Sequence, residues 1–114
     1  MNKTSAAHLR LPSLNGLRAF EAAARHLSFT EAAAELNVTQ TAVSHQIRRL
    51  EQELGIKLFV RQNRTIALTA EAQEYLPRIR AAFNDLRLAT ARLRQKDNGR
   101  VLTVSTLASL AAKW

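Results

Sequence analysis

Gln40, Thr41, Ser44 and His45 are the side chains whose types and spacing best fit hydrogen bonding to a large partner. An amide can pair with adenine through two hydrogen bonds, a threonine methyl can contact thymine, and a hydroxyl can bond to several base edges. An imidazole can donate to guanine or to a phosphate. Together these side chains predict a surface that reads base edges in double-stranded DNA.

The apolar residues among them indicate how these side chains share one surface. Val43, Ile47 and Leu50 are spaced by four and three residues, which places them on one side of a helix. The polar side chains then face outward from a recognition helix predicted over about residues 40–53. Arg48 and Arg49 lie further along this helix, where we expect them to contact phosphates.

Catalysis and metal binding fit the same residues poorly. Ser44 and His45 could be taken for a nucleophile and its base, but neighbours on a helix point about 100° apart. The sequence contains three His and no Cys, which argues against a metal site. We therefore expect no catalytic residue, no metal and no cofactor in this chain.

The segments before and after this helix carry helix start and stop signals. Ser28 and Glu31 form the Ser-x-x-Glu pattern of a capping box, Thr39 can cap the next helix, and Gly55 can end it. A short helix, a tight turn and a second helix form a helix-turn-helix, the arrangement that places one helix in the major groove. The start of the short helix also predicts a phosphate contact, through the hydroxyls of Ser28 and Thr30.

After Gly55 the hydrophobic period changes to that of strands. The runs 58–60 and 66–68 are apolar and β-compatible, and Asn63 between them suits a turn. They predict a two-stranded wing. We expect Arg64 at its tip to enter the minor groove and Arg61 to lie nearer the phosphate backbone.

Residues 70–96 are predicted to form a long helix that Thr69 caps, with Pro77 bending or locally breaking it. Residues at alternating spacings of three and four along this helix form a coiled-coil seam, which only Thr90 interrupts: Leu76, Ile79, Phe83, Leu86 and Leu93. This seam could pack back on the preceding domain. A small three-helix core covers only about two turns of it, so we expect a homodimer through this linker helix.

The charge balance supports a polyanionic partner. The chain has 17 Lys and Arg against 9 Asp and Glu, a formal charge of +8, and a pI of about 11.3. Such an excess fits DNA, although an acidic membrane surface would also attract it. No apolar run approaches the ~18 residues that span a bilayer, and the first residues lack the core of a signal peptide. We expect a cytoplasmic protein that does not bind membranes.

The fold class we predict is mainly α: a winged helix-turn-helix with a two-stranded wing, followed by a long dimerisation helix. Residues 1–10 form a flexible tail, 11–69 the DNA-binding domain and 70–96 the linker helix. The first helix of the domain carries an apolar stripe made of Leu14, Leu17, Phe20, Ala24 and Leu27. Residues 97–114 are expected to form a hinge and the truncated start of a second module, with a strand at 101–105.

Residues 11–105 resemble the N-terminal half of a LysR-type transcriptional regulator. The resemblance rests on Leu14–Phe20, Ala23–Ala33, Val38–Ile47, Leu50–Phe59 and Leu68–Thr69. Segments 22–28 and 101–114 are similar to the branch with the glycine-cleavage activator and the β-lactamase regulator. It supports the base-contacting residues above, and implies an operator in double-stranded DNA and a tetramer in a full-length form. It also implies a small-molecule effector, bound by a C-terminal domain of which this chain is expected to hold only the first strand. His45 stands where many members have Arg.

Two other functions remain open at this point. A non-specific or architectural DNA binder would line the recognition helix with Lys and Arg, whereas this helix carries amides and hydroxyls. A coiled-coil protein-interaction module would use only residues 70–96, with the basic hairpin incidental. Sequence-specific binding by a bacterial transcription regulator fits the residues best.

Overall fold

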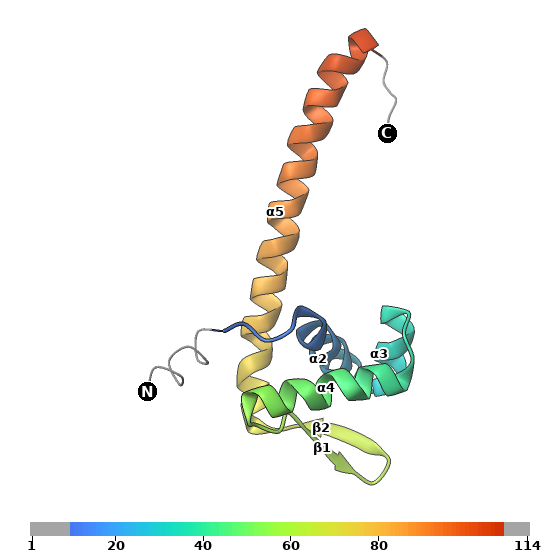
Figure 1. Cartoon of the computed structure of the whole chain (residues 1–114), viewed down its shortest axis with the longest axis vertical. Coiled ribbons are helices and arrows are strands. Elements are labelled where there is room, and N and C mark those ends of the chain that lie inside the picture. The colour runs from blue at the N-terminus through green and yellow to red at the C-terminus, as the bar shows by residue number, and fades with distance from the viewer. Residues whose placement is uncertain (1–9, 109–114) are drawn as a thin grey trace. The chain divides into compact units, whose positions relative to one another are not determined.

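The computed structural model describes residues 10–108, and the side chains of residues 10–96. In chain order it contains α2 (Leu14–His26), α3 (Phe29–Leu36), α4 (Gln40–Leu54), β1 (Phe59–Gln62), β2 (Thr65–Leu68) and α5 (Ala70–Ala108), shown in Figure 1. The chain divides into two compact units, one up to Ile79 and one from Arg80 onward. The mainly helical fold class, with a two-stranded antiparallel wing and a long final helix, is confirmed.

The helix-turn-helix is bounded by the predicted caps. The Ser28 and Thr39 hydroxyl oxygens each accept a hydrogen bond from the backbone N–H three residues on, at 3.1 and 3.0 Å. Asn37 and Gly55 end α3 and α4 with φ values of 60° and 70°, in the left-handed region. These local signals set where α4 begins and ends, and therefore which of its residues face outward.

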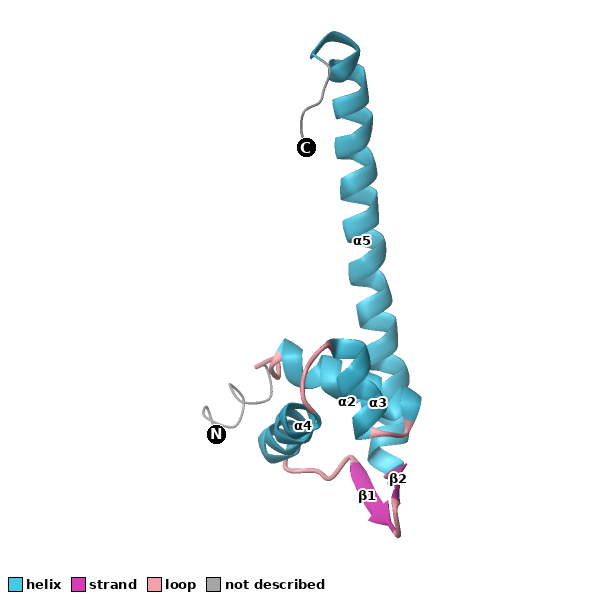
Figure 2. Cartoon of the chain, turned by 90° about the vertical axis from the view of Figure 1, so that its right-hand side faces the viewer, coloured by secondary structure: helices cyan, strands magenta, loops and turns pink. Residues whose placement is uncertain are grey.

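Aromatic side chains from several elements meet in the core of the first unit. Phe20 of α2 is fully buried, with its ring centroid 5.8 Å from those of both Phe59 and Tyr75. Phe29, at the start of α3, stands edge-on to Phe59 at 5.5 Å. Figure 2 shows α2, α3 and α4 grouped beside the β1–β2 hairpin. The core therefore holds the helix-turn-helix and the wing in one body.

The first helix buries less of its stripe than predicted. Leu17, Phe20 and Ala24 are buried, but Leu14 and Leu27 are 56% and 50% exposed. Leu27 is the C-cap of α2 and has a φ of 51°, so its side chain leaves the helical stripe. Leu14 is the first residue of the helix, at its outer end.

The wing is a tighter hairpin than predicted. β1 and β2 pair antiparallel from Phe59↔Leu68 to Gln62↔Thr65, which extends both strands beyond the apolar runs. Only Asn63 and Arg64 remain as a two-residue turn, and Asn63 has a φ of 58°. Such short turns need positive φ, which Asn tolerates well.

Helix α5 is longer than predicted. Its backbone is helical as far as Ala108, in place of the hinge after residue 96 and the strand expected at 101–105. An isolated strand has no partner for its backbone groups, whereas a helix satisfies them internally. The helix also runs through Pro77 without a break, because a proline removes a single donor and the bonds on both sides remain. The alternative that we predicted, a bend at this residue, stays a prediction. Residues 109–114 of the module expected at 97–114, and residues 1–9 of the predicted tail, lie outside the described residues.

Candidate nucleic-acid interface

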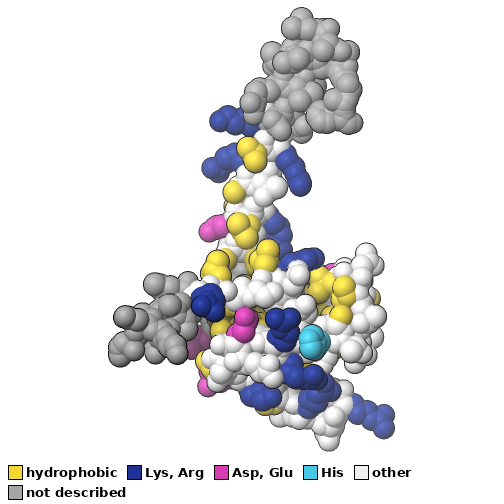
Figure 3. Space-filling view, in the orientation of Figure 1, with side chains coloured by type: hydrophobic (Ala, Val, Ile, Leu, Met, Phe, Trp, Pro, Cys, Tyr) yellow, Lys and Arg dark blue, Asp and Glu magenta, His cyan; other side chains and the backbone are white. Residues whose placement is uncertain are grey.

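The polar face predicted for α4 is accessible. Its inner residues Val43, Ile47 and Leu50 are 1%, 2% and 1% exposed. Ser44 is half-buried, and the exposed side chains of the opposite face include Gln40, Thr41, His45, Arg48 and Arg49. Figure 3 shows Lys and Arg side chains gathered over α4 and the wing. The fold thus brings the predicted hydrogen-bonding side chains onto one basic surface.

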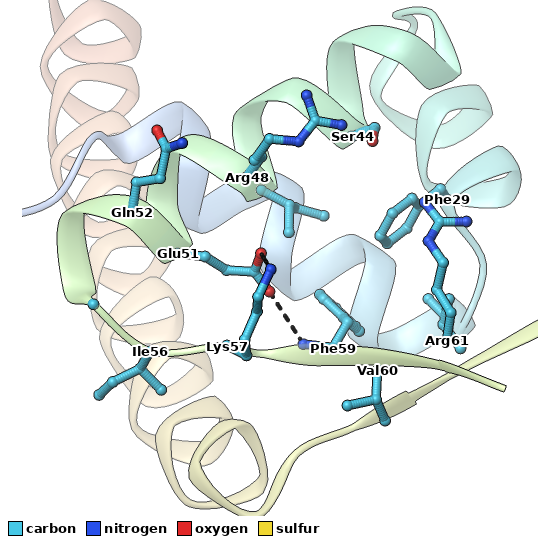
Figure 4. A pocket seen from close by; sticks show the side chains of 13 residues that line it. Phe29, Ser44, Arg48, Glu51, Gln52, Ile56, Lys57, Phe59, Val60 and Arg61 are labelled. Atoms are coloured by element: carbon cyan, nitrogen blue, oxygen red, sulfur yellow. Dashed lines mark hydrogen bonds and ion pairs between the residues drawn. The ribbon is translucent and has the colours of Figure 1, made fainter.

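Glu51 fixes the wing beside α4. One oxygen of its carboxylate accepts hydrogen bonds from the backbone N–H groups of Leu58, at 2.8 Å, and of Phe59, at 3.3 Å; Figure 4 shows the bond to Phe59. The other oxygen lies 3.9 Å from the Lys57 Nζ. The Glu51 side chain is 12% exposed, so these bonds lie largely out of water. A carboxylate on α4 therefore holds the start of β1 at a fixed place.

A groove of about 750 Å³ lies between α4 and the wing. Its lining includes Ser44 and Arg48 from α4, Lys57 and Arg61 from the chain leading through β1, and Phe29 from α3. In Figure 4, Arg48 and Arg61 lie on opposite sides of this groove. Cationic groups on both walls favour an anionic occupant such as a phosphate backbone.

Arg48 and Arg49, predicted together as phosphate contacts, differ in position. Arg48 lines the groove. Arg49 is exposed and lies about 100° further round the helix. The two arginines can therefore approach phosphates on different sides of α4.

Arg61 is oriented by an aromatic ring. Its guanidinium carbon lies 5.5 Å from the centroid of the Phe29 ring, which itself packs edge-on against Phe59. A cation over a ring face is held electrostatically, and the ring is fixed by the core. This geometry suits the predicted phosphate contact. Arg64 is exposed in the hairpin turn, as expected for a wing tip.

The start of α3 carries the two hydroxyl groups predicted to contact phosphates. The Ser28 hydroxyl oxygen accepts from the Glu31 N–H, which leaves its hydrogen available for a phosphate. The Thr30 hydroxyl instead donates its hydrogen to the Gln40 Oε1 at 3.2 Å. A hydroxyl has a single hydrogen, so Thr30 cannot also donate to a phosphate. The predicted phosphate contact of Thr30 stays a prediction, and it would require this hydrogen bond to open.

An ion-pair cluster locks α2 to α3. Arg25 donates to both Glu21 and Glu35, with N···O distances of 2.7 to 2.9 Å. The His26 Nε2 lies 2.7 Å from Glu35. The hydrogen bonds from Arg25 and then His26 lower the pKa of Glu35 to about 2, and donating to Glu21 and then Glu35 raises the pKa of Arg25. The two helices under the interface are thus joined by charges that satisfy one another.

The predicted dimer seam divides into two parts. Leu76 and Ile79 are 7% and 9% exposed in the single chain, so they belong to its own core and not to a free seam. The reason is that the first turns of α5 also carry Tyr75 against Phe20. Leu86 and Leu93 are 56% and 63% exposed. Only the later part of the stripe is open to a partner.

Sequence reasoning missed three residues that organise the site: Phe29, Glu51 and Lys57. Glu51 stands one turn before the C-cap Gly55 and shortly before an apolar run. A charge there, on the inner side of the helix, is the signal that could have drawn attention to it. No pattern in the sequence around Phe29 indicates its role, because that role depends on the packing of Arg61 from the wing over its ring.

An exposed polar helix held beside a basic hairpin defines a winged helix-turn-helix domain for nucleic-acid binding. In the part of the chain that the structure describes, no cluster of three or more His, Cys, Asp or Glu could hold a metal. None of the described helices is both long and apolar enough to cross a bilayer.

Comparison with known proteins identifies the family. The profile of the "Bacterial regulatory helix-turn-helix protein, lysR family" matches residues 14–73, and the chain belongs to this family. It is 56% identical over 105 residues to the glycine cleavage system transcriptional activator of Escherichia coli K12, covering 92% of this chain and 34% of the relative. It is 49% identical over 105 residues to the activator AmpR of Providencia stuartii, covering 92% and 36%. The chain thus spans about a third of the length of these curated relatives.

Solved structures support the same assignment. A complex of the BenM DNA-binding domain with benA site 1 DNA is 31% identical with a TM-score of 0.70, covering 76% of this chain and 98% of that one. A complex of the CbnR DNA-binding domain with DNA is 29% identical with a TM-score of 0.67, covering 75% and 98%. Membership of this family confirms the prediction of a LysR-type winged helix-turn-helix domain that binds DNA.

Proposed function

We propose that α4 lies in the major groove of a specific DNA site while the wing reaches the adjacent minor groove. The observation that carries this proposal is the open groove between α4 and the wing, with Ser44 and Arg48 on one wall and Arg61 on the other. An α-helix fits the major groove, and a short hairpin can follow the backbone beside it. The solved complexes of two relatives with DNA support this placement.

Within this complex the side chains divide by what they can contact. Base edges are read by Gln40, Thr41, Ser44 and His45, and Arg64 enters the minor groove. Phosphates are held by Ser28, Arg48, Arg49 and Arg61. The division follows from chemistry: amides and hydroxyls distinguish bases, whereas guanidinium groups further from the helix start neutralise the backbone.

We further propose that the regulator acts in the bacterial cytoplasm as a homodimer, with Phe83, Leu86 and Leu93 of α5 in the dimer contact. Leu86 and Leu93 are spaced by seven residues and are more than half exposed, although apolar. Such a spacing returns to the same side of a helix, so a second α5 could cover both. Dimers of this kind bind two half-sites, which raises affinity for a paired operator.

The test is selection from a library of randomised duplexes, followed by competition with scrambled DNA. We expect one sequence to be enriched and to outcompete scrambled DNA by at least about 10³-fold. Equal binding to all duplexes would instead indicate an architectural DNA binder. A chain that binds no duplex at low salt would leave only a protein-interaction role for α5.

A further inference from the structure

Gln40 is not a free amide at the start of α4. Its Oε1 accepts a hydrogen bond from the Thr30 hydroxyl at 3.2 Å. Thr30 belongs to α3, and the two residues lie ten positions apart in the chain. Both side chains are exposed, at the place where the turn between α3 and α4 brings the two helix starts together. A contact between helices therefore decides how the amide is turned.

The direction of this bond matters for base recognition. A free glutamine can turn its amide over and offer either an acceptor or a donor to a base. Because Oε1 is directed at Thr30, Nε2 is the amide atom that remains to contact a base, and Nε2 can only donate a hydrogen bond. In the major groove, guanine presents N7 and O6, adenine presents N7 and thymine presents O4 as acceptors, whereas cytosine presents only an amino donor.

We infer that Thr30 is a specificity-determining residue, which fixes the Gln40 amide so that the base it faces must offer an acceptor and cytosine is rejected. The inference rests on the proposed function, since it assigns a preference to one position of the site that α4 reads. Thr30 acts here through Gln40 and touches no base itself. It is a positioning residue, and its removal should change which base is chosen more than how tightly DNA is held.

A matched pair of variants separates this role from a structural one. Thr30→Val keeps the shape of the side chain and removes the hydroxyl, whereas Thr30→Ser keeps the hydroxyl. Each variant is first checked for unchanged thermal unfolding. Binding is then measured on duplexes that carry all four base pairs at every position of the sequence selected by the wild-type chain. Gln40→Ala identifies the base that Gln40 faces: it lies at the position where this variant no longer discriminates among the four base pairs.

At that position we expect the wild type and Thr30→Ser to disfavour cytosine equally. Thr30→Val should reduce the discrimination against cytosine by on the order of tenfold, because the freed Oε1 can accept from the cytosine amino group. In the Gln40→Ala background, Thr30→Val should have no further effect on base preference. Affinity for scrambled DNA should stay within about twofold in every variant.

Three results would overturn the inference. One is a Thr30→Val profile identical to that of the wild type. Another is an equal loss of affinity on all duplexes that persists in the Gln40→Ala background, which would make Thr30 a phosphate contact. The third is a Gln40→Ala variant that keeps the wild-type discrimination between base pairs at every position of the site, because Gln40 would then read no base. A wild-type chain that prefers no sequence at all would instead contradict the proposed function itself.

Discussion

Arg64, alone at the tip of the wing, is exposed in a two-residue turn. A narrow A-tract minor groove concentrates negative potential and attracts a guanidinium group on a short hairpin. Arg64→Ala should therefore weaken binding most when the half-site has A/T-rich flanks. Arg64→Lys should restore only part of the loss, because an ammonium is more strongly hydrated.

The measurement compares two duplexes that share the half-site and differ only in A/T or G/C flanks. Arg61→Ala serves as the control, since the phosphate role proposed for Arg61 should make its loss equal on both duplexes. If Arg64→Ala also loses the same affinity on both, Arg64 is a backbone contact.

For single residues, the sequence predicts the exposure of a side chain where that exposure depends only on the residue's own helix. The exposure of Gln40, Thr41 and His45 follows from the spacing of Val43 and Ile47, which is a local property. The bond from Thr30 to Gln40 and the stacking of Arg61 on Phe29 join separate elements. Their existence depends on how those elements pack, and no spacing in the sequence indicates it.

Among the elements, the link between α4 and β1 depends on Glu51. Removing its carboxylate leaves the backbone N–H groups of Leu58 and Phe59 without their acceptor. Glu51→Ala should therefore lower the free energy of unfolding by about 2 kcal/mol. It should also weaken DNA binding by releasing the wing.

Glu53→Ala is the matched control, because Glu53 is an exposed glutamate on the same helix. Urea unfolding of both variants and of the wild type provides the comparison. Equal stability of the two variants would mean that the Glu51 bonds do not hold the wing.

Element boundaries were predictable where capping residues mark them. The limits of α3 and α4 follow from their capping residues. Ser28 and Thr39 accept hydrogen bonds from free backbone N–H groups at the helix starts, and Gly55 ends α4 in the left-handed conformation. The end of α5 was not predicted. The polar cluster at 97–100 reads as a hinge, yet nothing there interrupts the helix in the structure. The apolar run at 101–105 fits a strand by sequence, but a short apolar run is compatible with either a strand or a helix until its packing partners are known.

For the whole molecule, the proposed dimer depends on the exposed part of the α5 stripe. Leu86→Glu combined with Leu93→Glu would place charges in the contact, where burial without a partner is costly. We expect this double variant to sediment as a monomer at concentrations where the wild type is a dimer. Variants at Leu76 or Ile79 are unsuitable, since both residues are buried in the single chain.

Leu88→Glu is the control for this experiment. Leu88 is also exposed, at 54%, but lies two residues from Leu86 and five from Leu93, on the other side of the helix. This variant should remain a dimer. A wild-type chain that is monomeric at high concentration, or a double variant that stays dimeric, would contradict the proposed contact.

The outward face of α4 is proposed to carry two kinds of side chain, base readers and phosphate anchors. The most direct measurement titrates Gln40→Ala and Arg49→Ala against the selected duplex and a scrambled one at several salt concentrations. Gln40→Ala should cost about 1–3 kcal/mol on the selected duplex and little on the scrambled one. Arg49→Ala should weaken binding to both duplexes similarly, and should reduce the slope of log K against log salt concentration by about one. An equal loss on both duplexes for Gln40→Ala would contradict the account.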